Sequence, residues 1–155
     1  MSSEITIRPY VPEDIDTIID IFLRAVRETA SKDYNEDQIA AWAQADKERW
    51  LKRCSGRHVW IAEINKTAAG FTDLEINGHL DRMFVHPGFQ NRGVASRLLK
   101  TVEEQAKSLY LRRIFTEASI TAKPFFMKKG FSVIIEQLVE TRGQRLKNFR
   151  MEKFL

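Results

Sequence analysis

Gln90-Asn91-Arg92-Gly93-Val94-Ala95 lies between an apolar, strand-like segment at residues 80–85 and a helical pattern at residues 96–109. A strand, a glycine-containing loop and a helix start, in that order, direct backbone N–H groups into a pocket, because the first N–H groups of a helix have no partner within it. The helix dipole also favours negative charge there, so the run predicts a phosphate or pyrophosphate site. Gly93 allows the backbone to approach such a ligand closely, and Arg92 adds a cation.

Two familiar nucleotide-binding motifs are excluded by the spacing. No Gly-Lys-Ser/Thr follows, as a P-loop requires, and the G-x-G-x-x-G fingerprint with its later acidic residue is missing. The run instead resembles the acetyl-CoA pyrophosphate loop of the GNAT superfamily of N-acetyltransferases, Q/R-x-x-G-x-G/A. In that family the loop follows a strand of pattern I-x-x-L-x-V-x-P, and Leu80, Met83, Val85 and Pro87 occupy those positions here.

A second motif further along the chain is similar to the same family. Residues 119–131 correspond to N-x-x-A-x-x-F-Y-x-x-x-G-F, with Ala122, Phe125, Gly130 and Phe131 in register. The opening residues 7–9, the segment at residues 30–43 and the closing residues 148–153 are similar to a bacterial GNAT subgroup with uncharacterised small-molecule substrates. The resemblance therefore covers nearly the whole chain.

Periodicity and turn signals predict one α/β domain, of the α+β type, over residues 1–155. The alternating segments predict strands at residues 5–9, 59–64, 69–76, 79–85, 114–119, 131–139 and 146–153. Helical spacing and start signals predict helices at residues 12–26, 35–42, 46–52, 96–109 and 122–129. Asn77-Gly78 predicts a two-residue hairpin turn, since such a turn needs positive φ at both positions.

The order of the elements predicts a mixed sheet. A helical crossover joins the strand at residues 79–85 to the strand at residues 114–119, so the two are expected to be parallel neighbours. The resemblance implies the GNAT fold: a mixed, mostly antiparallel sheet of six to seven strands with helices on both faces and with strands four and five parallel and splayed.

Composition bounds the remaining possibilities. The 155 residues are 43% hydrophobic and contain one cysteine, so we expect one domain without a disulfide, in a reducing compartment. No signal peptide or membrane-spanning run is visible, which predicts a cytoplasmic protein without a membrane partner. The net charge of +4 is spread over 25 basic and 21 acidic residues, without the basic stripe expected of a nucleic-acid partner. No metal site is expected, because the three histidines are scattered and Cys54 has no partner at ligand spacing.

The resemblance also implies which residues bind acetyl-CoA, the co-substrate. The pantetheine is expected along the backbone of Phe84, Val85 and His86, with a backbone N–H near Val85 polarising the thioester carbonyl. The pyrophosphate is expected at the loop and helix start. The full set of expected cofactor contacts is Phe84, Val85, His86, Gln90, Asn91, Arg92, Gly93, Val94, Ala95, Ser96, Ser119 and Phe126.

The general base is expected near residue 79. The family often has a glutamate six residues before the valine of the strand motif, and this chain has His79 there. An imidazole with a pKa near ~6.5 suits proton transfer at neutral pH. Asp81, two residues on, should face the same side unless a bulge intervenes, and either Asp81 or Glu75 could act instead through water.

The general acid departs from the family pattern. The tyrosine that commonly protonates the leaving thiolate is replaced by Phe126, which is expected to pack against the pantetheine instead. A thiol of pKa about 8.5 can leave unassisted near neutral pH. Ser119, Thr121 or Tyr34 could also supply a proton, and the sequence does not choose among them.

The acceptor site is expected between the N-terminal helices and the last hairpin, with Tyr34, Trp42 and Arg142 as lining residues. The leading hypothesis is an N-acetyltransferase that moves an acetyl group from acetyl-CoA directly to the amine of a small molecule in a ternary complex, as a monomer or homodimer. The alternative is an acyl-CoA-binding domain with a sensor or regulatory role and little catalysis, which Phe126 favours.

Overall fold

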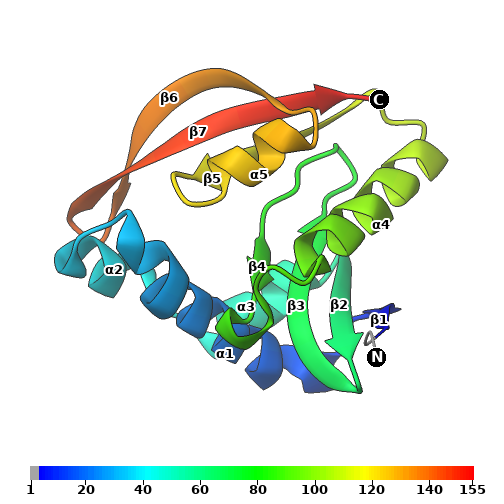
Figure 1. The fold of residues 1–155 in the computed structure, drawn as a ribbon, viewed down its shortest axis with the longest axis horizontal. Coiled ribbons are helices and arrows are strands. Elements are labelled where there is room, and N and C mark those ends of the chain that lie inside the picture. Colours follow the sequence, from blue (N-terminus) through cyan, green and yellow to red (C-terminus); the bar gives the residue numbers. More distant parts are fainter. Residues whose placement is uncertain (1–3) are drawn as a thin grey trace.

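Seven strands form two antiparallel sheets in the computed structural model, which describes residues 4–155 (Figure 1). The first sheet contains, in spatial order, β1 (Ile5–Pro9), β2 (His58–Ile64), β3 (Thr67–Leu74) and β4 (Met83–Val85). The second contains β5 (Arg113–Ser119), β7 (Gln144–Phe154) and β6 (Ser132–Thr141). The expected α+β class with mostly antiparallel pairing is confirmed.

The helices begin close to the positions that the start signals predict. They are α1 (Ile15–Arg24), α2 (Glu36–Trp42), α3 (Lys47–Cys54), α4 (Val94–Ser108) and α5 (Lys123–Lys128). Asn35 and Asp46 cap α2 and α3, because their side chains accept the backbone N–H three residues on. The first helix continues beyond α1 as a π-helical turn, Ala25–Thr29, which the sequence pattern does not reveal.

Helices cover both faces of the first sheet (Figure 1). Side chains alternate along a strand, so Ile61 of β2 and Phe71 of β3 pack with α1 and α3, whereas Ala62 packs with α4. Gly70 permits the close approach of α4, because a Cβ there would lie 3.0 Å from Val94 Cγ1 and 2.9 Å from the Phe84 carbonyl oxygen.

The turn after β3 differs from the predicted two-residue hairpin. Its loop has three residues, 76–78: the Gly78 N–H donates to the Glu75 carbonyl at 3.0 Å and the Glu75 N–H to the His79 carbonyl at 2.9 Å. Only Gly78 has positive φ, 95°. A two-residue turn with positive φ at both positions occurs instead between β6 and β7, at Arg142 and Gly143.

The predicted strand at residues 79–85 is interrupted. Only Met83–Val85 pairs with β3 as a ladder, because the buried carboxylate of Asp73 accepts the backbone N–H groups of Asp81 and Arg82. The expected parallel neighbours meet at one isolated parallel bridge, between His79 and Phe115, and β4 and β5 lie in different sheets.

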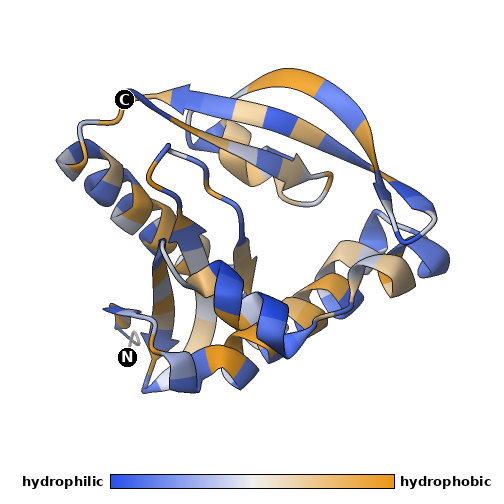
Figure 2. Ribbon diagram, turned by 180° about the vertical axis from the view of Figure 1, so that it is seen from behind, coloured by the Kyte–Doolittle hydropathy of each residue, from blue (hydrophilic) through white to orange (hydrophobic). Residues whose placement is uncertain are grey.

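One apolar cluster joins the two sheets. Leu99 and Val102 of α4 pack with Leu74 of the first sheet and with Ile114 and Met151 of the second. Figure 2 shows apolar residues alternating with polar ones along the helices, and apolar residues also on β6. Within residues 4–155, no helix has the length and apolar character that crossing a bilayer requires.

Candidate active site

Two adjoining cavities lie at the carboxyl ends of β4 and β5. The first, here called the α4 cavity, has a volume of about 350 Å³ and is bounded by β4, the start of α4, α5 and the π-helical turn. The second, here called the α3 cavity, has a volume of about 690 Å³ and is bounded by α3, β4, β5 and the β6–β7 hairpin. Trp42, Phe84 and Ser119 line both cavities and therefore mark where they meet.

The N-terminus of α4 is open toward the α4 cavity. Its N-cap, Gly93, has φ 82° and provides no side-chain cap, in contrast to Asn35 and Asp46 at α2 and α3. The first turn of α4 contains no acidic residue. Backbone N–H groups at the start of α4 are therefore available to an anion, and the helix dipole favours one there.

The edge of β4 remote from β3 is the second polar feature of the α4 cavity. The His86 N–H donates to Ala69 and the Asp73 N–H donates to Arg82, so the even-numbered residues of this segment pair with β3. Strand alternation directs the N–H and C=O groups of Met83 and Val85 to the opposite edge. The Val85 carbonyl accepts a bond from Gln90 Nε2 at 3.3 Å.

Most of the predicted acetyl-CoA contacts lie together around this cavity. Those that line it are Phe84, Val85, Gln90, Asn91, Gly93, Ala95, Ser96, Ser119 and Phe126. Three others direct their side chains elsewhere: Val94 is buried in the core, Arg92 lies over the Phe89 ring, and His86 contacts the Arg24 guanidinium at 2.7 Å. Any contact from these three would come from the backbone or a rearranged side chain.

The predicted acceptor residues Tyr34, Trp42 and Arg142 all line the α3 cavity. Tyr34 and Trp42 form an edge-to-face pair with ring centroids 5.4 Å apart. Arg142, in the β6–β7 turn, donates from Nη1 to the Ala41 carbonyl at 2.7 Å. That bond ties the hairpin to α2 and completes one wall of the cavity.

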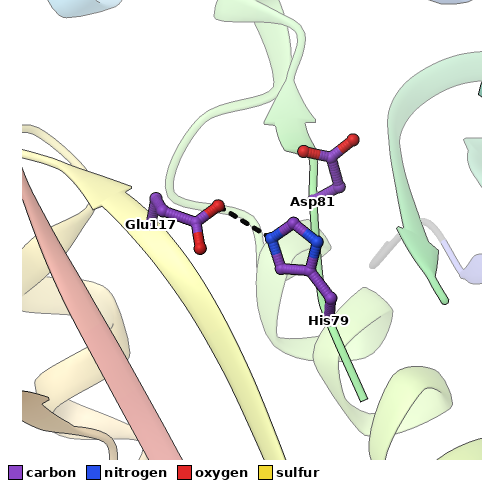
Figure 3. A group of neighbouring side chains, drawn as sticks. All are labelled: His79, Asp81 and Glu117. Carbon is purple, nitrogen blue, oxygen red and sulfur yellow. Dashed lines mark hydrogen bonds and ion pairs between the residues drawn. The ribbon is translucent and has the colours of Figure 1, made fainter. Parts of the chain in front are cut away.

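His79, Asp81 and Glu117 come together beside the bridge that joins His79, in the segment before β4, to Phe115 of β5 (Figure 3). His79 Nε2 lies 2.7 Å from Glu117 and Nδ1 lies 2.9 Å from Glu75. The hydrogen bond to Glu117 outweighs the opposing effect of burial and, with Glu75, raises the pKa of His79 to about 9. The imidazole is therefore protonated at neutral pH, which contradicts the unperturbed pKa assumed from the sequence.

Asp81 is held by two arginines. Arg53 Nη2 and Arg57 Nη1 donate to its carboxylate at 2.5 and 2.8 Å. Burial would raise the pKa of Asp81, but these bonds and charges outweigh burial and lower it. His79, Asp81 and Glu117 offer metal-ligand atoms within 4.8 Å of one another, yet protein cations already balance these carboxylates, and the expectation of no metal stays a prediction.

The three hydroxyl groups proposed as proton donors differ in their partners. Tyr34 donates to the Lys147 carbonyl at 2.5 Å and Thr121 donates to Asp33 at 2.8 Å. Ser119 accepts the Ala122 N–H at 3.0 Å. Among the described residues, the proton of Ser119 has no acceptor, so it is the one of the three free to donate into the cavities.

Glu117 is the functional candidate that sequence reasoning missed. It lines the α3 cavity, as Asp81 and Ser119 do, whereas His79 does not. One signal in the sequence could have identified it. Glu117 is the only charged residue in the strand predicted at residues 114–119, and it lies two positions before Ser119. The π-helical turn was missed too, although Ala25 and Thr29 line the α4 cavity.

Comparison with known proteins gives a consistent result. The family described as acetyltransferase (GNAT) domain matches residues 30–153. YafP of Escherichia coli (strain K12), named an uncharacterized N-acetyltransferase, is 43% identical over 149 residues, which are 96% of this chain and 95% of YafP. A GCN5-related N-acetyltransferase from Rhodopseudomonas palustris superposes with a TM-score of 0.96 at 32% identity, covering 100% of this chain and 98% of its own. PaiA N-acetyltransferase from Thermoplasma acidophilum, solved with coenzyme A, superposes with a TM-score of 0.80 at 23% identity, covering 98% and 99%.

Proposed function

The chain belongs to the acetyltransferase (GNAT) family, and we propose that it is an N-acetyltransferase that moves an acetyl group from acetyl-CoA to the amine of a small molecule within a ternary complex. The observation that carries the proposal is the pair of cavities that meet at Trp42, Phe84 and Ser119. One cavity has an open helix N-terminus suited to a pyrophosphate, and the other contains carboxylates suited to an amine.

Acetyl-CoA occupies the α4 cavity in this proposal. The pyrophosphate accepts hydrogen bonds from the N–H groups at the start of α4, and the pantetheine lies along the free edge of β4, in the gap toward β5. The outward-facing Val85 N–H then polarises the thioester carbonyl, as a donor in an oxyanion hole does. PaiA, solved with coenzyme A and sharing the fold, supports this assignment.

Glu117 is the proposed general base. Its carboxylate lines the α3 cavity, whereas Asp81 is engaged by arginines and His79 is protonated. The acceptor reaches the enzyme as an ammonium ion and loses a proton to Glu117, directly or through water. The free nitrogen attacks the thioester carbon, the C–S bond breaks and the thiolate leaves, and the nitrogen releases its second proton to water as the amide forms. The imidazolium of His79 is a positioning group that fixes the Glu117 carboxylate.

Ser119 is the proposed proton donor to the departing thiolate. It lines both cavities, and its Oγ is held by the Ala122 N–H while its own proton is free. This accounts for how the chain works without a tyrosine at Phe126. A Ser119→Ala variant should lose part of kcat and retain its affinity for acetyl-CoA.

The first experiment is calorimetric titration with acetyl-CoA, followed by a panel of amines with release of the free thiol monitored. Saturable binding with amine-dependent thiol release would establish the transferase. Binding without turnover on a broad panel would favour the sensor role instead. Absence of binding would contradict the assignment of the α4 cavity.

A further inference from the structure

We propose that the acceptor carries an anionic group, a carboxylate or a phosphonate, as well as its amine. The inference rests on the proposed function, because it concerns what the α3 cavity selects. Its basis is the charge distribution of that cavity: its lining includes six basic side chains and three carboxylates. The basic residues are Arg49, Lys52, Arg53, Arg82, Arg142 and Lys147, and the acidic ones are Asp46, Asp81 and Glu117.

Three of the six cations are paired with carboxylates of the protein. Arg53 binds Asp81, Arg82 Nε binds the buried Asp73 at 2.8 Å, and Lys147 lies 3.8 Å from the exposed Glu136. Within each pair, the carboxylate offsets the positive charge of its partner. The pairs do not account for the positive excess around the cavity.

Arg49, Lys52 and Arg142 carry that excess, which the remaining carboxylate of the lining, Asp46 at the N-cap of α3, offsets only in part. Within residues 4–155, no carboxylate lies within ion-pair distance of any of them, and the one side-chain bond of Arg142 is to a carbonyl. Arg49 and Lys52 are three residues apart on α3, and Arg53 is four from Arg49, so the three side chains share one face of the helix. All three line the cavity, which gives α3 a cationic wall.

Asp46, the third carboxylate of the lining, caps α3 itself by accepting the Arg49 N–H at 3.1 Å, whereas the other two lie on other elements. Asp81 precedes β4 and Glu117 lies on β5, two residues before Ser119, where the two cavities meet. An acceptor with its ammonium group toward Glu117 can extend its anionic group toward α3, with Trp42 and Phe84 as apolar walls between. A polyamine would instead place its second cation near Arg49 and Lys52, where like charges repel.

The test compares acceptors that differ only in the anionic group. Common amino acids and aminoalkyl phosphonates are compared with their neutral amides and decarboxylated amines, at saturating acetyl-CoA and with thiol release as the readout. We expect the anionic members to have kcat/KM values at least about tenfold higher, mainly through KM, because charge-assisted bonds are worth roughly a factor of ten or more. The double variant Arg49→Gln with Lys52→Gln should remove this preference.

The matched control is Lys47→Gln on the same helix. Lys47 pairs with Asp16 at 3.2 Å and does not line the cavity, so its loss should leave the preference unchanged. A second measurement does not depend on turnover: calorimetric binding of N-acetyl amino acids against their neutral N-acetyl amides, in the presence of coenzyme A.

The outcomes separate this inference from the proposed function. Tighter binding of the anionic products, lost in the double variant, supports the inference even if no amine tried is acetylated. Equal or better binding and turnover of the neutral compounds overturns it while leaving the transferase intact. A preference that survives in the double variant also overturns it, because the cationic wall would then not be its source.

Discussion

His79 lies between two carboxylates, with Nδ1 2.9 Å from Glu75 and Nε2 2.7 Å from Glu117. This environment stabilises the imidazolium and raises the pKa of His79 to about 9. His79, which the sequence motif indicated as the general base, therefore already holds a proton at neutral pH. Glu117, drawn beside it in Figure 3, is therefore the group that we propose as acceptor of the amine proton.

Replacing Glu117 by glutamine should lower kcat by roughly 10²–10⁴-fold and leave the Kd for acetyl-CoA unchanged, because a general base contributes about that factor to proton transfer. The same variant should lower the pKa of His79, which NMR of the imidazole can follow. Glu103→Gln is the matched control: Glu103 also forms a 2.7 Å ion pair, with Lys153, away from both cavities. Full activity in Glu117→Gln would remove Glu117 from the mechanism.

The raised pKa of His79 predicts a specific pH dependence of stability. A group whose pKa is higher in the folded than in the unfolded protein stabilises the fold fully below its unfolded pKa, about 6.5, and this contribution is lost as pH rises through about 9. It amounts to at most about 3 kcal/mol. Urea unfolding of the protein and of a His79→Gln variant at about pH 6 and about pH 10 should give a difference in free energy of unfolding that shrinks at the higher pH. A pH-independent difference would contradict the ion-pair geometry.

The start of α4 is a helix terminus left open toward the α4 cavity. Gly93 has a positive φ and no capping side chain, and its backbone leads directly into the first free N–H groups of α4. β4 lies beside it because Gly70 of β3 leaves room for both α4 and the Phe84 carbonyl. Two glycines therefore set the shape of the α4 cavity in different ways, one through its dihedral angle and one through space.

A Gly93→Val variant should weaken acetyl-CoA binding by at least about tenfold, measured by calorimetry, because a left-handed conformation is strained for a β-branched residue and the free N–H groups would be displaced. Gly56→Val is the control. Gly56 also has positive φ, 75°, has no atom within 4 Å of a built Cβ and lines neither cavity. It should lose a similar amount of stability, about 1–2 kcal/mol, with no change in affinity. Equal affinity in both variants would contradict the loop assignment.

Gly70→Ala should destabilise the protein by about 1–3 kcal/mol, because its Cβ would meet a backbone carbonyl that cannot move cheaply. The contacts would be 2.9 Å to the Phe84 oxygen and 3.0 Å to Val94 Cγ1. Acetyl-CoA affinity should fall as well, since relief of the clash shifts β4 from β3. Urea denaturation and calorimetry measure the two effects, and wild-type stability in this variant would contradict the packing described.

The two sheets of the molecule share one apolar cluster (Figure 1). They diverge from the isolated bridge between His79 and Phe115. The two cavities lie on the side where the sheets diverge, and their linings draw on both sheets. A ligand in the α4 cavity contacts β4 from one sheet and Ser119 from the other. Binding should therefore stabilise the fold as one unit.

Acetyl-CoA at about 100 times its Kd should raise the free energy of unfolding by about 2.7 kcal/mol. For a chain of this size that corresponds to a rise in melting temperature of roughly 5–10 °C, which a thermal-shift titration can measure. The Gly93→Val variant should show a smaller shift at the same concentration. A wild-type shift that does not depend on acetyl-CoA concentration would contradict binding to the folded state.

Local sequence patterns were sufficient to predict much of the fold and most of the residues that line the α4 cavity. The order and type of the elements, the open start of α4 after Gly93, and the hairpin around Arg142 depend on periodicity and turn chemistry within short windows. The family resemblance rested on two such windows, and comparison with known proteins confirms it.

Only the tertiary structure decided which groups meet in the site. The strand at residues 79–85 is broken by Asp73, a residue in another strand, and the state of His79 depends on Glu117, which lies 38 positions further along the chain. The cationic wall lies on α3, and only folding brings it to the same cavity as Asp81 and Glu117. Pairing across such separations depends on burial and charge in three dimensions, which a periodic pattern along the chain does not encode.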